Sequence, residues 1–86
     1  MNKLPVLAEG ATDKAGEVFF VHRMQALVKV YGQITGLADV ACQETAGTFD
    51  ATTTANVRAV QAHAGIEQDG VAGQQTWGVL VAGSAA

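Results

Sequence analysis

The sequence predicts a small all-α domain with three main helices and a short extra helix or a long loop between the first two. Its 86 residues suffice for one domain, which we expect to span residues 1–86. An apolar stripe at helical spacing predicts the first main helix. Glycines and cap residues mark the ends of two further helical segments. Hydrophobic residues make up 49% of the chain and charged residues 15%, which indicates a folded globule.

The first main helix is predicted from about Lys14 to Tyr31. Gly32 is its expected C-terminal stop, because glycine readily adopts the left-handed conformation that ends many helices. Before this helix, residues 1–11 are expected to form an extended lead-in that ends at Gly10. The apolar side chains that share one helical face are Phe20, Met24, Leu27, Val28 and Tyr31.

A short helix is predicted from Leu37 to Gln43, within the least regular part of the chain. The second main helix is predicted from about Ala51 to Ala64, with Asp50 as its N-cap and Gly65 just past its end. Its inward face carries Thr53, Val57, Val60, Gln61 and Ala64.

The third main helix is predicted from about Gln74 to Val81, after a loop and turn over residues 66–70. An Asp-Gly pair in that loop is typical of a tight turn. Residues 83–86 are expected to form a frayed tail. The inward side chains of this helix are predicted to be Trp77, Leu80 and Val81.

The charge balance and the hydropathy pattern exclude two classes of protein. Five Lys and Arg against eight Asp and Glu give a net charge of −3, and the basic residues form no stripe that would neutralise nucleic-acid phosphate. No run of about 18 apolar residues is present to span a membrane. The apolar stretch near the N-terminus is too short for a signal peptide, so we expect synthesis in the cytoplasm.

No catalytic or metal-binding constellation is visible in the sequence. Cys42 is the single cysteine, which excludes an internal disulfide, and we expect a small, partly buried apolar residue there. His22 and His63 are the only candidate bases for a cysteine nucleophile, and neither lies in a recognisable hydrolase pattern. The same residues lack the spacing of a zinc site. Asp50 and Asp69 fit cap and turn positions, so we predict a non-catalytic protein without a cofactor.

Two stretches share one pattern and suggest an internal repeat. The first repeat runs from Gly47 to Thr53 and the second from Gly70 to Thr76. Each has a glycine, a short apolar segment, a cap residue (Asp50, then Gly73) and a final threonine. The glycine permits an unusual backbone, the apolar residue anchors the loop, and the cap satisfies the first helical N–H groups.

These stretches resemble the peptidoglycan-binding-like domain family. Residues 47–61 are similar to its first signature, which is Gly-x-Phe-Gly, then Thr, then Ala-Val-x-x-Phe-Gln. Residues 64–80 are similar to its second, which is Gly-Leu, then Asp-Gly-Val-Val-Gly, then Thr-Trp and Leu. Residues 21–27 resemble its opening helix, Val-x-x-Leu-Gln-x-x-Leu. The resemblance covers about residues 4–82 and implies a compact three-helix bundle joined by capped loops.

The chain departs from the family pattern mainly in the first signature. Asp50 stands where the family usually has glycine, Val60 replaces a phenylalanine, and Ala46 replaces an acidic residue. The loop from Gln33 to Ala46 is also longer than the minimal pattern. These departures bear on ligand binding more than on the fold.

Most motif residues have a structural explanation as core side chains, helix-start hydrogen-bonding groups or glycines with an unusual backbone. Gln25 and Gln61 are polar on otherwise inward faces, and we expect each to hydrogen-bond a loop carbonyl or N–H group. The structural motif residues are Gly47, Phe49, Thr53, Val57, Gly65, Gly70, Gly73 and Leu80.

The resemblance implies recognition of peptidoglycan, through its glycan strand or its stem peptide. In the family, such a module is non-catalytic and usually targets an attached hydrolase to the cell wall. A site for this ligand needs an apolar platform and a few fixed hydrogen-bonding groups. The candidate ligand-binding residues are Tyr31, Gln61, Asp69, Thr76 and Trp77.

No hydrolase accompanies the module in this chain, and three hypotheses address that absence. The first is a bacteriophage protein that contacts the host wall, in the virion or during lysis, since a virion protein needs no signal peptide. The second is a capsid or tail decoration that binds phage structural proteins. The third is a fragment of a larger hydrolase, although Met1 and a complete lead-in favour a whole protein. We therefore expect a virion-associated protein or one that acts at the bacterial cell wall.

Overall fold

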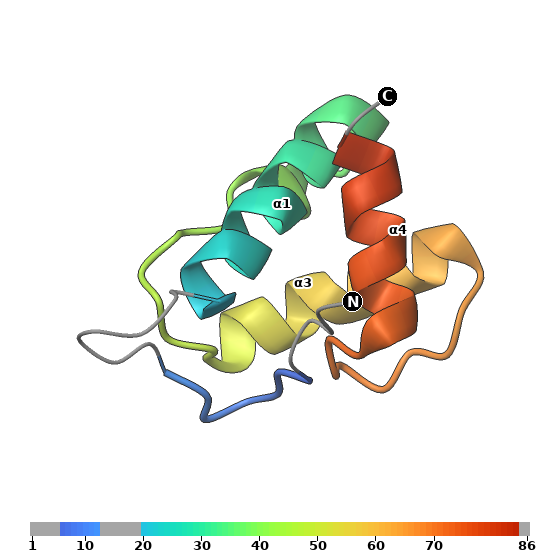
Figure 1. Ribbon diagram of the computed structural model, residues 1–86. Coiled ribbons are helices and arrows are strands. Elements are labelled where there is room, and N and C mark those ends of the chain that lie inside the picture. Colours follow the sequence, from blue (N-terminus) through green and yellow to red (C-terminus); the bar gives the residue numbers. More distant parts are fainter. Residues whose placement is uncertain (1–5, 13–19, 85–86) are drawn as a thin grey trace.

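The part of the chain that the computed structural model describes, residues 6–12 and 20–84, folds into four helices (Figure 1). Helix α1 spans Phe20–Thr35, α2 Ala38–Ala41, α3 Ala51–Ala64 and α4 Gln74–Ser84. The predicted all-α fold, with a short helix between the first two main helices, is confirmed. The predicted start of the first helix lies outside the described residues. None of the described helices is long and apolar enough to cross a membrane.

Helix α1 is the central element, since it contacts α2, α3 and α4. In the view of Figure 1, α1 and α4 rise beside one another and α3 crosses below them. The core between them draws on every helix and on both repeats, while Phe20 and Leu27 are partly buried against it. The buried core residues are Leu7, Val21, Met24, Val28, Tyr31, Val40, Phe49, Val57, Val60, Ala72, Trp77 and Leu80.

Both ends of α3 follow the sequence prediction. Asp50 is the N-cap, and its Oδ1 accepts the N–H of Thr53 at 2.9 Å. Gly65 is the C-cap with φ of +75°, and its N–H donates to Ala62 O at 3.2 Å. A side chain would strain that left-handed conformation, which explains the glycine.

Gly32 does not end α1, contrary to the sequence prediction. The helix continues to Thr35, and Gly36 with φ of +79° follows its end. Gly32 is buried where α1 meets α2, and a Cβ atom there would lie 2.3 Å from the backbone nitrogen of Ala41. The missing side chain therefore permits the close approach of these two helices.

Three further predictions about exposure and helix length were wrong. Helix α4 continues to Ser84, so the predicted tail is helical over residues 83 and 84, and residues 85–86 lie outside the described part. Val81 is 50% exposed, because the buried stripe of α4 runs through Thr76, Trp77 and Leu80, away from Val81. Cys42 is exposed directly after the end of α2.

The described part of the lead-in, residues 6–12, joins the two repeats. Leu7 and Ala72 exchange backbone hydrogen bonds of 3.1 and 2.7 Å. Phe49 donates its N–H to Ala11 O at 2.8 Å and accepts the N–H of Gly10 at 2.9 Å. Figure 1 shows this segment in blue along the base of the molecule, beside the loops that lead into α3 and α4. One extended segment, as predicted, thereby fixes both loops.

Candidate functional site

Gln25 on α1 organises the first repeat, as its polar side chain on an inward face predicts. The side chain is buried, and its Oε1 accepts the N–H of Gly47 at 2.9 Å. Its Nε2 donates to Thr48 O at 2.9 Å and to Thr53 Oγ1 at 3.1 Å. Gly47 has φ of +83°, a conformation that favours glycine. One carboxamide thus satisfies a loop N–H, a loop carbonyl and a hydroxyl in the first turn of α3.

Gln61 on α3 plays the same part for the second repeat. Its Oε1 accepts the N–H of Gly70 at 3.0 Å. Its Nε2 lies 3.0 Å from both Val71 O and Thr76 Oγ1, and 2.9 Å from Asp69 Oδ1. The sequence-based expectation that both glutamines hydrogen-bond loop groups is confirmed.

The two networks are structurally equivalent, which confirms the internal repeat. Each glycine and threonine of the first repeat lies 23 positions before its counterpart in the second, and each pair contacts a buried glutamine in the same way. Phe49 and its counterpart Ala72 are both buried and both pair with the lead-in. The equivalence extends upstream at the same spacing, because Cys42 caps the end of α2 and Gly65 caps the end of α3.

A third buried carboxamide supports the first repeat, and the sequence prediction missed it. Gln43 Nε2 donates to Glu44 O at 2.7 Å and to Thr53 Oγ1 at 3.1 Å. Its Oε1 accepts from Asn56 Nδ2 at 2.7 Å. Asn56 lies one helical turn after Thr53, so its place on the inward face of α3 was the available signal.

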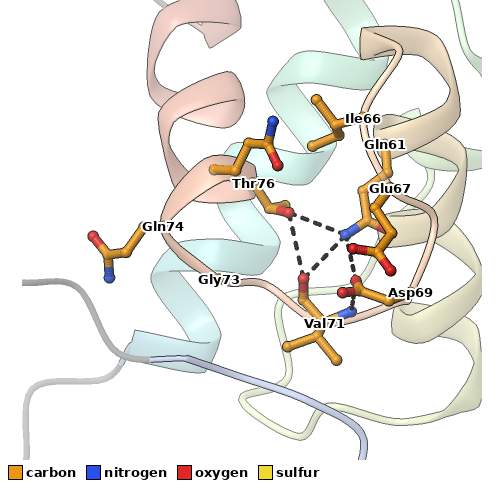
Figure 2. Close-up of a pocket in the computed structure, with 9 residues that line it drawn as sticks. Gln61, Ile66, Glu67, Asp69, Val71, Gly73, Gln74 and Thr76 are labelled. Atoms are coloured by element: carbon orange, nitrogen blue, oxygen red, sulfur yellow. Dashed lines mark hydrogen bonds between the residues drawn. The ribbon is translucent and has the colours of Figure 1, made fainter.

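A pocket of about 170 Å³ opens at the second repeat, between its loop and the first turn of α4 (Figure 2). Gln61 and Thr76 are buried on its inner side, and hydrogen bonds join both of them to Val71 O. Ile66 adds a half-buried apolar wall. The lining residues are Gln61, Ile66, Glu67, Asp69, Val71, Gly73, Gln74, Gln75 and Thr76.

Three of the five predicted ligand-binding residues meet at this pocket: Gln61, Asp69 and Thr76. Trp77 is 2% exposed and belongs to the core. Tyr31 is buried on α1, where its hydroxyl lies 2.7 Å from His63 Nδ1 and the two rings meet edge to face. Neither aromatic side chain lines the pocket, whose apolar lining residues are Ile66 and Val71.

The two glycines of the second repeat serve different purposes. Gly70 has φ of +74°, a conformation that favours glycine, and a Cβ atom there would also press against the side chains of Thr54 and Arg58. Gly73 has no positive φ, and a Cβ atom there would meet nothing within 4 Å. The predicted backbone role of Gly73 is therefore wrong, and Gly73 instead lines the pocket without a side chain.

Hydrogen bonds to the ionised form lower the pKa values of two carboxyl groups. The N–H of Val71 and the carboxamide of Gln61 hold the pKa of Asp69 below its ordinary value of 3.8. The N–H and then the hydroxyl of Thr53 lower the pKa of Asp50 in the same way. Asp69 is therefore ionised at neutral pH and gives the pocket a negative side.

Folding stability is expected to fall when the pH drops below about 4. Both aspartates have a lower pKa in the folded than in the unfolded chain, so their stabilising contribution is complete above the unfolded value. It is lost as the pH falls through the folded values. The check is the thermal midpoint between pH 7 and pH 2.5, for the wild type and for an Asp50→Asn, Asp69→Asn variant. The variant should show the shallower decline, and an equally steep one would contradict the assignment.

Other reactive side chains lie outside this pocket, and three of them, Cys42, Glu44 and Asp50, line a separate pocket of about 200 Å³ at the first repeat. In the described part of the chain, no group of three or more His, Cys, Asp or Glu side chains could hold a metal ion. His22 Nδ1 lies 2.6 Å from Thr45 O on the surface. His63 contacts Tyr31, and Cys42 is exposed.

Comparison with known proteins bears on the same part of the chain. Residues 20–80 match the family described as "Putative peptidoglycan binding domain". The match runs from α1 into α4, so it includes both repeats and the pocket. No curated protein and no solved structure matches the chain. Because the matched residues make up well over half of the sequence, the protein belongs to this family of peptidoglycan-binding modules.

Proposed function

We propose that the protein is a non-catalytic module that acts at the bacterial cell wall by binding peptidoglycan through the pocket of the second repeat. The observation that carries the proposal is the meeting of Gln61, Asp69 and Thr76 at a concave surface inside the family match. Ligand sites combine such a concavity with a few fixed polar groups.

The rigidity of the pocket supports the same proposal. Asp69 Oδ1 accepts the N–H of Val71 at 2.9 Å, and Gln61 ties the loop to α3 through several hydrogen bonds. A loop that is already ordered loses little conformational entropy when a ligand binds. The pocket is thus preorganised to bind a rigid polymer such as a glycan strand.

A sacculus pull-down tests the proposal. The folded 86-residue chain is expected to sediment saturably with purified sacculi, whereas the heat-unfolded chain is not. Alanine at the exposed lining residues Glu67 and Gln75 should lower the bound fraction at least fivefold. The matched control places alanine at Glu44 and Thr52, the equivalent exposed positions of the first repeat, and should bind as the wild type does.

Walls from an actinobacterium and from a Gram-negative species are compared in the same assay. Absence of saturable binding to both walls would overturn the proposal. Equal losses in the Glu67, Gln75 variant and in the Glu44, Thr52 variant would leave wall binding in place and remove it from this pocket.

The exposed apolar side chains favour a second proposal, a structural role in a bacteriophage particle. Val30 and Ile34 lie one turn apart on α1 and are 37% and 48% exposed, and Val81 on α4 is 50% exposed. Exposed apolar surface is typical of protein contact sites. Such a protein should co-purify with phage particles, and serine at Val30 and Ile34 should release it. A chain that remains free of particles would contradict this role.

A further inference from the structure

In the first repeat, the hydroxyl of Thr53 uses its full hydrogen-bonding capacity. A threonine hydroxyl offers one proton and two lone pairs. Thr53 Oγ1 uses all three, since it donates to Asp50 Oδ1 at 3.0 Å and accepts from Gln25 Nε2 and Gln43 Nε2, each at 3.1 Å. The last of these donors is a side-chain carboxamide from the loop.

The equivalent hydroxyl in the second repeat makes fewer hydrogen bonds. Thr76 Oγ1 accepts from Gln61 Nε2 at 3.0 Å and donates to Val71 O at 3.3 Å. Within residues 6–12 and 20–84, no second donor reaches it. Thr76 is 3% exposed and lines the pocket, so the remaining lone pair is available to a ligand group that enters the pocket.

The residue at the place of Gln43 distinguishes this pocket from the pocket of about 200 Å³ that Gln43 and Glu44 line in the first repeat. Gln43 lies 23 positions before Ile66, the same spacing that separates the two repeats. Ile66 lines the pocket and has no hydrogen-bond donor in its side chain. Ile66 therefore cannot donate to Thr76 as Gln43 donates to Thr53, and it gives the pocket an apolar wall.

We propose that this pocket binds the acetamido group of an N-acetylated sugar. The amide N–H of the acetamido group donates to Thr76 Oγ1, as the carboxamide of Gln43 does to Thr53 Oγ1. The acetyl methyl group packs against Ile66. This assignment rests on the proposed wall binding and deepens it, because it names the glycan strand as the part of peptidoglycan that enters the pocket.

The charge and size of the pocket favour this neutral group over a stem-peptide carboxylate. Asp69 is ionised, and the carboxylate of Glu67 also lines the pocket, so an anionic ligand is repelled. The volume of about 170 Å³ accommodates an acetamido group without a whole sugar ring buried around it. The exposed carboxamide of Gln75 lies among the lining residues and offers a donor for the acetyl carbonyl.

The test is a titration of the isotope-labelled full chain, followed by amide chemical shifts, with tri-N-acetylchitotriose as the probe. Saturable shifts are expected at Thr76, Gly73 and the side-chain amide of Gln61. The deacetylated glucosamine trimer should bind at least tenfold more weakly. Ile66→Gln copies the first repeat and places an internal carboxamide beside Thr76, so it should also weaken binding at least tenfold. Its thermal midpoint should stay within a few degrees of the wild-type value, and Ile66→Leu should retain binding.

Three results would overturn the assignment. Equal binding of the acetylated and deacetylated trimers would remove the acetamido group from the interaction. Unchanged binding by a folded Ile66→Gln variant would place the ligand elsewhere. Shifts at the same amides with a free stem peptide, and none with the sugar, would assign the pocket to the peptide. In each case wild-type binding to sacculi would still support a role in wall binding, whereas failure of sacculus binding would reject that role.

Discussion

Replacement of Gln61 by alanine is expected to destabilise the fold by about 3–5 kcal/mol, because it leaves several buried polar groups without partners at once. The N–H of Gly70 loses its acceptor at 3.0 Å, and Val71 O and Thr76 Oγ1 lose their common donor. A small domain has roughly 5–15 kcal/mol of folding free energy in all. The expected outcome is a chain close to its unfolding transition at 37 °C.

Chemical denaturation of the Gln61→Ala variant measures this loss, with Gln75→Ala as the control. Gln75 is exposed beside the same pocket and makes no buried hydrogen bond of this kind, so its replacement should change the free energy of unfolding by less than about 0.5 kcal/mol. Gln25→Ala should behave like Gln61→Ala, because the two glutamines have equivalent partners. A Gln61→Ala variant as stable as the control would contradict the central role of the carboxamide.

Gly32→Ala is expected to cost about 3 kcal/mol or more, although alanine normally stabilises a helix. The new Cβ atom would lie 2.3 Å from Ala41 N and 2.6 Å from the carbonyl carbon of Val40. Both are backbone atoms, so no side-chain rotation relieves the clash, and α2 must move away from α1. The free energy of unfolding and the hydrogen exchange of α2 amides should both fall.

Gly78→Ala is the matched control for this substitution. Gly78 also lies inside a helix, but a Cβ atom there meets nothing within 4 Å. That variant should gain about 0.5–1 kcal/mol through the lower conformational entropy of its unfolded chain. A Gly32→Ala variant that gains stability as Gly78→Ala does would contradict the close contact between α1 and α2.

Local signals in the sequence predicted the parts of the fold that depend on neighbouring residues. The cap at Asp50 and the glycine at position 65 fixed both ends of α3, since capping involves only the adjacent turn. The polar residues Gln25 and Gln61 on apolar faces predicted their hydrogen bonds to loops. Three of the candidate site residues meet at the pocket because Thr76 belongs to the second repeat, Asp69 directly precedes it, and Gln61 hydrogen-bonds both.

Features that depend on residues far apart in the sequence could not be predicted from it. Gly32 is suited both to end a helix and to permit a close contact, and only the position of α2 decides between them. Asn56 lies on the inward face of α3, but its partner Gln43 comes from the preceding loop. Tyr31 was expected to face inward, yet its contact with His63 depends on how α1 and α3 pack.

The segment that pairs with both repeats also determines when the fold can be completed. Leu7 pairs with Ala72 across most of the length of the chain, whereas Gly10 and Ala11 pair with Phe49. Contacts between residues so far apart in sequence form slowly, because a long loop must close first. During synthesis the N-terminal segment therefore waits for the second repeat to emerge from the ribosome. The two repeats then become one cooperative unit, and neither reaches its final stability before the second repeat has been synthesised.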